Sequence, residues 1–362
     1  MTNPAETHPH AARIMRLREA MSDLDLPAML ITDLVNVRYL CGFTGSNASL
    51  GVLADDVFLV TDGRYLDQAA AECPDMRIVP GRQTSEVAMR EMSADPRIGV
   101  EANHMTLAGY DRLTAISHRE LVATTDVVER LRRCKDPGEV RLIARACAII
   151  SEVLSILESE IGPGMTERSL AQRLYWLVQD LGGDDIAFDT IVASGPNSAI
   201  PHHSPTDRVI EPGDLLKIDA GALLNGYHSD ITRTYVVGAE PTPKQRTLHN
   251  AVRTAAFAAR ELARPGVAGQ EADAAARSVL AEYGFDDNFS HGLGHGVGLQ
   301  IHEAPMIGRE STDTMADGDV LTIEPGAYLP GFGGVRVEDT LALTADGTDC
   351  LTTAARELIR LG

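Results

Sequence analysis

Apolar residues follow two different periods along the first third of the chain, which predicts alternating helices and strands. Residues 11–22 place their apolar side chains on one face at helical spacing, whereas residues 27–32 form a short apolar run that predicts a buried strand. We also expect an extended piece around Tyr39 and a hairpin that turns at Asp55 and Asp56. The strands predicted in this part of the chain are 27–32, 50–54, 57–61, 98–101 and 121–123. This alternation is typical of an α/β domain.

A break in the pattern at residues 132–138 predicts a domain boundary. Pro137 fits the first turn of a long helix that we expect to continue to about Glu160, because proline lacks only a backbone N–H that is unpaired there anyway. We therefore expect an N-terminal domain, residues 1–133, and a C-terminal domain, residues 134–362. A chain of 362 residues is long enough for two domains with sizeable cores.

The C-terminal part contains an internal repeat. GPGMTERSLAQRLYWLVQDLG, which begins at Gly162, parallels RPGVAGQEADAAARSVLAEYG, which begins at Arg264, and each leads from a Pro-Gly turn into a predicted helix. PGDLLKIDAGA at residues 212–222 likewise parallels DGDVLTIEPGA at residues 317–327. Both copies run from a turn into a strand that ends near an acidic residue. The repeat therefore predicts an α+β domain built from two pseudo-twofold halves.

Four acidic residues occupy matched places in the two copies. Asp219 and Glu324 lie at the same point of the repeated strand, and Asp230 and Glu338 follow them shortly afterwards. Any one of these acids, taken alone, is more simply interpreted as an edge or turn residue. Four carboxylates in one place would repel one another and hold protons unless cations balanced them. The matched set therefore predicts a centre with two divalent metal ions.

Glycine alternates with other residues in SHGLGHGVGLQIHEAP, residues 290–305, which presents His291, His295 and His302. Each glycine inside a helix would cost roughly 1 kcal/mol, so we expect extended or turning backbone that permits close approach of another group. Unrelated surface histidines are the alternative interpretation. If His295 completes the centre, the ligand set is rich in oxygen donors, which favours Mn²⁺, Co²⁺ or Fe²⁺ at least as much as Zn²⁺. Two such ions can acidify a water molecule and polarise a carbonyl group.

Composition narrows the class of protein. The formal net charge of −20 disfavours nucleic acid and anionic membranes as partners. The five cysteines are scattered without a CxxC pair, which suits a reducing compartment better than a disulfide framework. The chain has neither an apolar leader segment nor a run of about eighteen apolar residues. We therefore expect a cytoplasmic protein.

The motifs KIDAG, YHSDITRT, HGLGHGVGLQIHEAP, TIEPG and RVEDT resemble the metal-binding motifs of the pita-bread metallopeptidases, family M24. Within that family they resemble the Xaa-Pro branch, which comprises aminopeptidase P and prolidase. GFTGSNAS and TDGRYLDQA in the N-terminal part resemble the creatinase-type domain of the same branch. The resemblance implies two divalent metal ions, with Mn²⁺ the favoured choice. The metal ligands that it implies are Asp219, Asp230, His295, Glu324 and Glu338.

The resemblance also implies roles around the metal centre. His202 resembles a histidine that stabilises the tetrahedral intermediate, and His302 resembles one that contacts the substrate near the proline-side amide. His291 resembles a histidine that lines the pocket, and Arg336 could hold a carboxylate of the site or the peptide. Glu324 is the candidate for moving a proton from water to the leaving nitrogen.

Two residues beside these positions, His203 and Glu303, fit a structural role as well as a direct one. The leading hypothesis is an Xaa-Pro aminopeptidase, with an Xaa-Pro dipeptidase as the alternative. A scaffold of the same fold without activity, a methionine aminopeptidase and a metal-free creatinase-like hydrolase fit less well, because all five ligand motifs are intact and an extra N-terminal domain is present. The resemblance further implies peptide substrates with proline in second position, and a homodimer.

Overall fold

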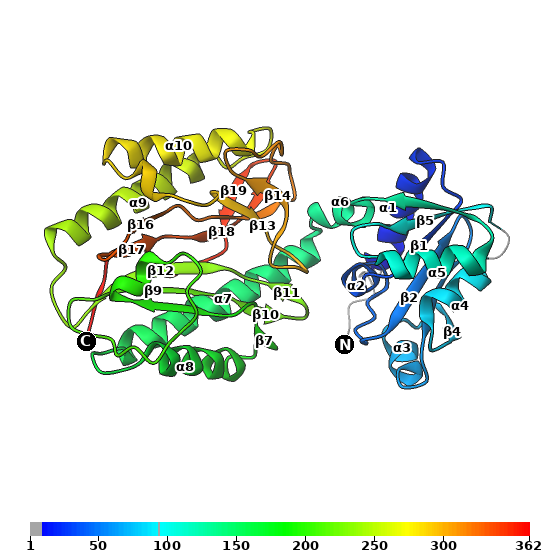
Figure 1. Cartoon of the computed structure of the whole chain (residues 1–362), viewed down its shortest axis with the longest axis horizontal. Coiled ribbons are helices and arrows are strands. Elements are labelled where there is room, and N and C mark those ends of the chain that lie inside the picture. The colour runs from blue at the N-terminus through cyan, green and yellow to red at the C-terminus, as the bar shows by residue number, and fades with distance from the viewer. Residues whose placement is uncertain (1–8, 93–94) are drawn as a thin grey trace. The chain divides into compact units, whose positions relative to one another are not determined.

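The computed structural model of the protein describes residues 9–92 and 95–362. The chain divides into two compact units, Met1–Arg132 and Arg133–Gly362 (Figure 1). In the described parts of the chain, no helix is both long enough and apolar enough to cross a membrane.

A six-stranded sheet forms the centre of the N-terminal unit, with the strand order β4-β3-β2-β1-β5-β6. The sheet is mixed, because β1 pairs antiparallel with β2 and parallel with β5. The strands are β1 Ala28–Ile31, β2 Ala48–Leu53, β3 Val57–Thr61, β4 Arg77–Pro80, β5 Arg97–Glu101 and β6 Glu120–Thr124. The helices are α1 Pro9–Asp23, α2 Leu34–Cys41, α3 Leu66–Glu72, α4 Thr84–Glu91, α5 Leu107–Ser117 and α6 Val127–Arg133. The predicted first helix, the hairpin and the five strands are present, within one or two residues of the predicted ends.

The prediction of extended backbone around Tyr39 is wrong, because this residue lies in helix α2. Asp33 caps the start of that helix by accepting a hydrogen bond from Val35 N. Gly42 ends it in the left-handed conformation, with φ 86°, and its N–H donates to Arg38 O. Both caps are visible in the sequence, and together they outweigh the strand preference of the apolar run between them.

Helix α7, Pro137–Glu160, opens the C-terminal unit with the predicted bounds. The Asp136 side chain accepts hydrogen bonds from the N–H groups of Gly138 and Glu139, and the Glu139 side chain accepts one from Asp136 N. This reciprocal cap and Pro137 at the first turn explain why the helix starts there.

Two similar halves make up the rest of the unit, as the internal repeat predicts. The first half contains α7, α8 Glu167–Asp180, β7 Asp185–Ile186, β8 Ile191–Ser194, η1 Gly195–Ala199, β9 Leu215–Ala220, β10 Ala222–Leu224, β11 Tyr227–His228 and β12 Ile231–Val237. The second half contains α9 Pro243–Leu262, α10 Gly269–Glu282, η2 Asp286–Asn288, β13 Gly294–Gly296, β14 Glu303–Ile307, β15 Val320–Ile323, β16 Gly326–Leu329, β17 Gly333–Arg336, β18 Asp339–Thr344 and β19 Gly347–Cys350. The short final strand β20, Arg360–Leu361, returns to pair with β12.

Strand pairing repeats between the halves. In the first half β9 lies between β8 and β12, and in the second half β15 lies between β13 and β18. Isolated bridges join Thr166 to Val209 and Ala268 to Thr314, so the two equivalent positions lie 102 residues apart, like the sequence repeat that starts at Gly162 and Arg264. The repeat in the sequence is therefore a repeat in the structure.

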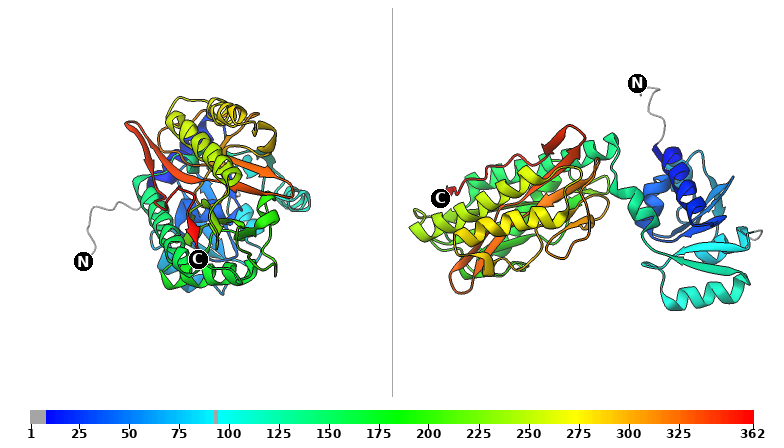
Figure 2. Two further views of the ribbon diagram at one scale, coloured as in Figure 1. Left: turned by 90° about the vertical axis from the view of Figure 1, so that its left-hand side faces the viewer. Right: turned by 90° about the horizontal axis from the view of Figure 1, so that it is seen from above.

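Each half has its own hydrophobic core. Leu154, Leu174 and Ile218 belong to a cluster that packs α7 and α8 on the strands of the first half. Leu248 and Leu321 belong to a second cluster, beneath α9 and α10. Figure 2 shows α9 and α10 side by side along the strands of this unit. The two cores fix the two sheets, and the ends of their strands meet at the candidate site.

Candidate active site

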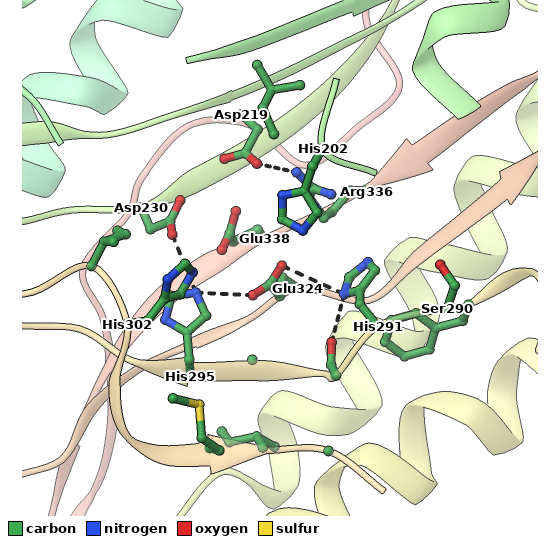
Figure 3. Close-up of a pocket in the computed structure, with 18 of the residues that line it drawn as sticks. His202, Asp219, Asp230, Ser290, His291, His295, His302, Glu324, Arg336 and Glu338 are labelled. Carbon is green, nitrogen blue, oxygen red and sulfur yellow. Dashed lines mark hydrogen bonds and ion pairs between the residues drawn. The ribbon is translucent and has the colours of Figure 1, made fainter. Parts of the chain in front are cut away.

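The structure places all nine of the predicted site residues around one cavity of about 1080 Å³ in the C-terminal unit. Both halves contribute to its wall, as Figure 3 shows. The predicted residues that line the cavity are His202, Asp219, Asp230, His291, His295, His302, Glu324, Arg336 and Glu338. The structure therefore brings the predicted residues together at the junction of the halves.

The four carboxylates come from equivalent strands. Asp219 lies in β9, and Glu324 directly follows the equivalent strand β15. Asp230 directly precedes β12, and Glu338 directly precedes the equivalent strand β18. The Glu338 N–H donates to Thr232 O at 3.1 Å, so the backbones of the two halves are joined beside the carboxylates. The cluster thus follows from the repeated topology.

The glycine-rich segment brings His295 into this cluster through extended backbone, as predicted. A Cβ atom on Gly294 would lie 2.0 Å from Thr322 O, and one on Gly296 would lie 2.3 Å from Ala304 O. Neighbouring backbone therefore approaches so closely that only glycine fits at these two positions.

The imidazole of His295 presents one nitrogen to the carboxylates. Its Nδ1 lies 3.1 Å from Gly296 O, a carbonyl that can only accept, so Nδ1 carries the proton. Its Nε2 faces the carboxylates, 3.3 Å from Glu324 Oε1 and 3.7 Å from Asp230 Oδ2, and is therefore the nitrogen that would bind a cation. A backbone-fixed tautomer of this kind is typical of a metal-binding histidine.

Metal binding fits the donor atoms of the cluster. Among the described residues, Asp219 Oδ1 and Asp230 Oδ1 are buried and have no hydrogen-bond partner. One ligand atom each from Asp230, His295 and Glu338 lies within 4.8 Å of the others. Buried oxygen atoms without partners are costly in a folded protein unless another group satisfies them, and a divalent cation would do so.

Charge leads to the same interpretation. Burial, followed by the repulsion of Glu338 and the other carboxylates, raises the pKa of Asp230 well above its usual range. Burial, followed by the charge of Glu324, likewise raises the pKa of Glu338. Without a cation these two acids would therefore hold protons, and bound cations would let them ionise.

Arg336 is the cation that the structure supplies to the cluster. It is 2% exposed and forms an ion pair with Asp219 through Nη2. Its Nε donates to Thr232 Oγ1 at 3.1 Å, and that hydroxyl donates to Glu338 Oε2 at 2.6 Å. Its Nη1 donates to Tyr328 Oη at 2.8 Å. Arg336 thus holds a carboxylate of the site, one of the two roles foreseen for it.

His291 contacts the hydroxyl of the same tyrosine. Its Nδ1 lies 2.8 Å from Gly292 O and its Nε2 lies 2.8 Å from Tyr328 Oη. Burial lowers the pKa of His291 to about 4, so the ring is neutral and accepts the tyrosine proton at Nε2. The ring of His302 packs edge-on against His295, with the ring centroids 4.3 Å apart.

His202 points into the cavity from a loop that is fixed behind it (Figure 3). Lys217, which is fully buried, donates to Ile200 O at 2.7 Å and to Pro201 O at 3.1 Å. The neighbouring His203 points its Nε2 to Glu167 Oε2, 2.8 Å away. Contacts on both sides therefore leave the imidazole of His202 facing the site.

Glu303, the other residue with an open role, is 8% exposed and forms an ion pair with Lys135 at 3.3 Å. It also accepts a hydrogen bond from Gln300 N at 2.9 Å. These contacts favour the structural role for Glu303, because they hold the turn that precedes β14.

Sequence reasoning missed several residues that contact the predicted ones. Tyr328 joins Arg336 to His291, and its only signal is that it directly follows the second copy of the repeat, residues 317–327. Lys217 is the first residue of KIDAG, two positions before Asp219, but its contacts with residues 200 and 201 cross a sequence gap that no local pattern reveals. Thr232, which contacts Glu338, lies in the motif HSDITRT.

The profile of metallopeptidase family M24 matches residues 141–345, more than half of the chain. The chain belongs to metallopeptidase family M24. The creatinase/prolidase N-terminal domain matches residues 13–134, so the M24 catalytic domain follows a creatinase-type domain here. This confirms the expected fold class, an α/β domain before an α+β pita-bread domain.

Relatives of this M24 chain extend over nearly its whole length. The Xaa-Pro dipeptidase of Pyrococcus furiosus is 36% identical over 96% of this chain and 99% of its own. The structure of an Xaa-Pro dipeptidase from Bacillus anthracis is 33% identical, with a TM-score of 0.94 over 97% of this chain and 100% of that one. An X-Pro aminopeptidase structure from Thermotoga maritima is 32% identical, with a TM-score of 0.89 over 96% and 99%. The expected resemblance to the Xaa-Pro branch is confirmed.

Proposed function

We propose that this protein is a metal-dependent peptidase that hydrolyses the bond between an N-terminal residue and a following proline. The observation that carries the proposal is the cluster of four carboxylates and His295 in the wall of one cavity, with two buried carboxylate oxygens left without partners among the described residues. Relatives named Xaa-Pro dipeptidase and X-Pro aminopeptidase support the choice of substrate.

Two divalent cations are the cofactor that we propose. The residues that would hold them are Asp219, Asp230, His295, Glu324 and Glu338. Oxygen donors dominate this set, which favours Mn²⁺, with Co²⁺, Fe²⁺ and Zn²⁺ as alternatives. When bound, such cations acidify a water molecule and polarise a carbonyl group.

Side chains of the protein supply the remaining steps. Glu324 is ionised, because the hydrogen bond and charge of His295 outweigh burial and lower its pKa to about 2. Its carboxylate accepts a proton from the attacking water and passes it to the proline nitrogen as the C–N bond breaks. His202 donates a hydrogen bond to the oxyanion that forms on the scissile carbonyl. This route needs no N–H on the scissile bond, which an Xaa-Pro peptide lacks.

The other proposed roles concern binding. His302 contacts the substrate near the proline-side amide, His291 lines the pocket, and Arg336 orients Asp219 and, through Thr232, Glu338. Each of the three side chains reaches the wall of the cavity.

Dipeptides and longer peptides are both candidate substrates, and Arg309 favours dipeptides. Among the described residues, the arginines that line the cavity are Arg277, Arg309 and Arg336. Arg277 donates to Asp273 at 2.7 Å and Arg336 is paired with Asp219, whereas Arg309 is exposed at the cavity wall. An exposed arginine there can bind the terminal carboxylate of a dipeptide. We therefore place the dipeptidase function, first considered as the alternative, ahead of aminopeptidase activity on longer chains.

Kinetics on Ala-Pro and Ala-Pro-Ala test this choice. Arg309→Gln is expected to reduce kcat/KM for Ala-Pro by about ten- to a hundredfold, the usual worth of one charged hydrogen bond, with less effect on the tripeptide. Arg246→Gln, which removes an exposed arginine of α9 outside the cavity wall, is the control and is expected to change neither value. Equal losses on both substrates would contradict carboxylate recognition by Arg309.

We further propose a cytoplasmic homodimer without nucleic-acid partners, in which the boundary between the domains lies at residues 133 and 134. The net charge of −20 supports the absence of nucleic acid as a partner. The five cysteines are scattered without a CxxC pair, which supports a reducing compartment. Light scattering of the full chain tests the homodimer.

A further inference from the structure

One buried carboxylate closes the loop that carries His202. Glu167, the first residue of α8, is 0% exposed. Its Oε1 accepts hydrogen bonds at the start of the loop, from Ser194 N at 2.7 Å, Ser194 Oγ at 2.8 Å and Asn197 Nδ2 at 3.0 Å. One oxygen therefore holds the end of β8 and the short helix η1 that follows it.

The second oxygen of Glu167 holds the far end of the same loop. Oε2 accepts hydrogen bonds from Thr206 N at 3.0 Å and Thr206 Oγ1 at 2.7 Å, and it lies 2.8 Å from His203 Nε2. His202 lies between the two groups of donors. The carboxylate therefore fixes both ends of a segment that has no paired strand to support it.

In the other half of the domain, direct packing of a helix on a strand takes the place of the hydrogen bonds of Glu167. Gly269 is the equivalent of Glu167 in the repeat, 102 residues later. A Cβ atom on Gly269 would lie 2.9 Å from Met306 O, so the helix there packs directly on strand β14. Strand β14 is held by β13, whereas residues 200–206 belong to no helix or strand, and apart from backbone hydrogen bonds at their two ends they are held by side chains.

We infer that Glu167 is a positioning residue, which fixes residues 194–206 so that His202 faces the reacting carbonyl. The inference rests on the proposed function of His202. Glu167 suits this task because an ionised carboxylate only accepts hydrogen bonds, and every group around it is able to donate. Burial opposes its charge, but hydrogen bonds from Thr206, His203 and Ser194 lower its pKa to about 2.

Glu167→Gln is the sharpest perturbation. Its amide replaces one acceptor oxygen with an NH₂ group, and either orientation of that amide faces a group of donors. The loop is then released at one end. We expect kcat to fall by about ten- to a hundredfold, because small displacements of a catalytic group have effects of that size. Thr206→Val, which removes one of the donors to Glu167 together with the acceptor of Arg208 N, is a milder variant and is expected to lower kcat by roughly threefold.

Two measurements test the inference. In a double-mutant cycle, Glu167→Gln is expected to lose most of its effect on kcat once His202→Ala is present, because both changes act on the same step. Hydrogen exchange followed by mass spectrometry is expected to show faster exchange within residues 194–206 in Glu167→Gln. The control Glu139→Gln alters another buried glutamate of this unit, which accepts a hydrogen bond from Tyr227 Oη at 2.9 Å. We expect it to show neither coupling to His202→Ala in kcat nor faster exchange within residues 194–206.

Either of two results would overturn the inference: a full effect of Glu167→Gln in the His202→Ala background, or unchanged exchange in residues 194–206. The exchange experiment does not depend on substrate. If the wild-type protein failed to cleave Xaa-Pro peptides, the proposed function would fall, while unchanged exchange would separately refute the anchoring role of Glu167. If Glu167→Gln did not fold, Thr206→Val would carry both measurements.

Discussion

Removing a single hydroxyl from Tyr328 tests how the site is held together. Tyr328 Oη accepts a hydrogen bond from Arg336 and donates one to His291, each at 2.8 Å. Tyr328→Phe keeps the ring in place and removes both bonds. A hydrogen bond to a charged group contributes about 1.5–3 kcal/mol, so the free energy of unfolding is expected to fall by that amount. For a domain of this size the melting temperature would fall by about 3–12 °C.

Activity should respond to the same change, because Arg336 also holds Asp219. Loss of an outer contact of a metal site typically lowers activity by roughly tenfold or more, and we expect that effect on kcat. The matched control is Tyr227→Phe. Tyr227 is also buried and donates to Glu139 Oε1 at 2.9 Å, but it does not line the cavity. The control should lose comparable stability and keep its kcat.

Thermal unfolding of metal-free protein and steady-state kinetics of metal-loaded protein provide both readouts. If Tyr328→Phe lost stability but kept full activity, as the control should, Tyr328 would be structural only. If neither stability nor activity changed, the hydrogen bonds of Tyr328 to Arg336 and His291 would be without consequence.

Three further predictions follow from individual side chains. Asp230→Ala or Glu338→Ala should abolish activity and lower the bound metal measured by mass spectrometry; near-normal turnover with two metals bound would contradict their assignment as ligands. His202→Ala should lower kcat by about 10²–10³ with metal content preserved, and loss of metal would instead place His202 among the ligands. Burial lowers the pKa of His249 to about 4, so the folded state binds fewer protons than the unfolded state between about pH 4 and 6.5. The free energy of unfolding must therefore decrease as the pH is lowered through that window. His249→Gln should remove up to about 1.4 kcal/mol per pH unit from the slope of unfolding free energy against pH, and an unchanged slope would contradict a buried neutral His249.

The sequence predicted the parts of the structure that follow from local pattern and from the repeat. Pro137 and its flanking cap residues set the start of α7, and the matched acids Asp219 and Glu324 lie on equivalent strands. Repetition made this possible, because one copy tells where the other must lie.

The failures are of two kinds. The segment around Tyr39 is helical and not extended, because the caps at Asp33 and Gly42 outweigh the strand preference of the apolar run between them. The contacts of Glu167 and Tyr328 could not have been found from local pattern, since their partners lie 27 to 39 and 8 to 37 residues away. Contacts of this kind depend on how separate elements pack, and no local periodicity records them.

Peptide hydrolysis after removal and return of metal tests the central claim most directly. The protein is stripped with a chelator, reloaded with Mn²⁺, and assayed on Ala-Pro, Ala-Pro-Ala and the control Ala-Ala, with bound metal counted in the same samples. We predict no turnover without metal, two metal ions per chain after reloading, and hydrolysis of the proline peptides alone. Unchanged turnover after chelation, or equal turnover of Ala-Ala, would contradict a metal-dependent Xaa-Pro peptidase.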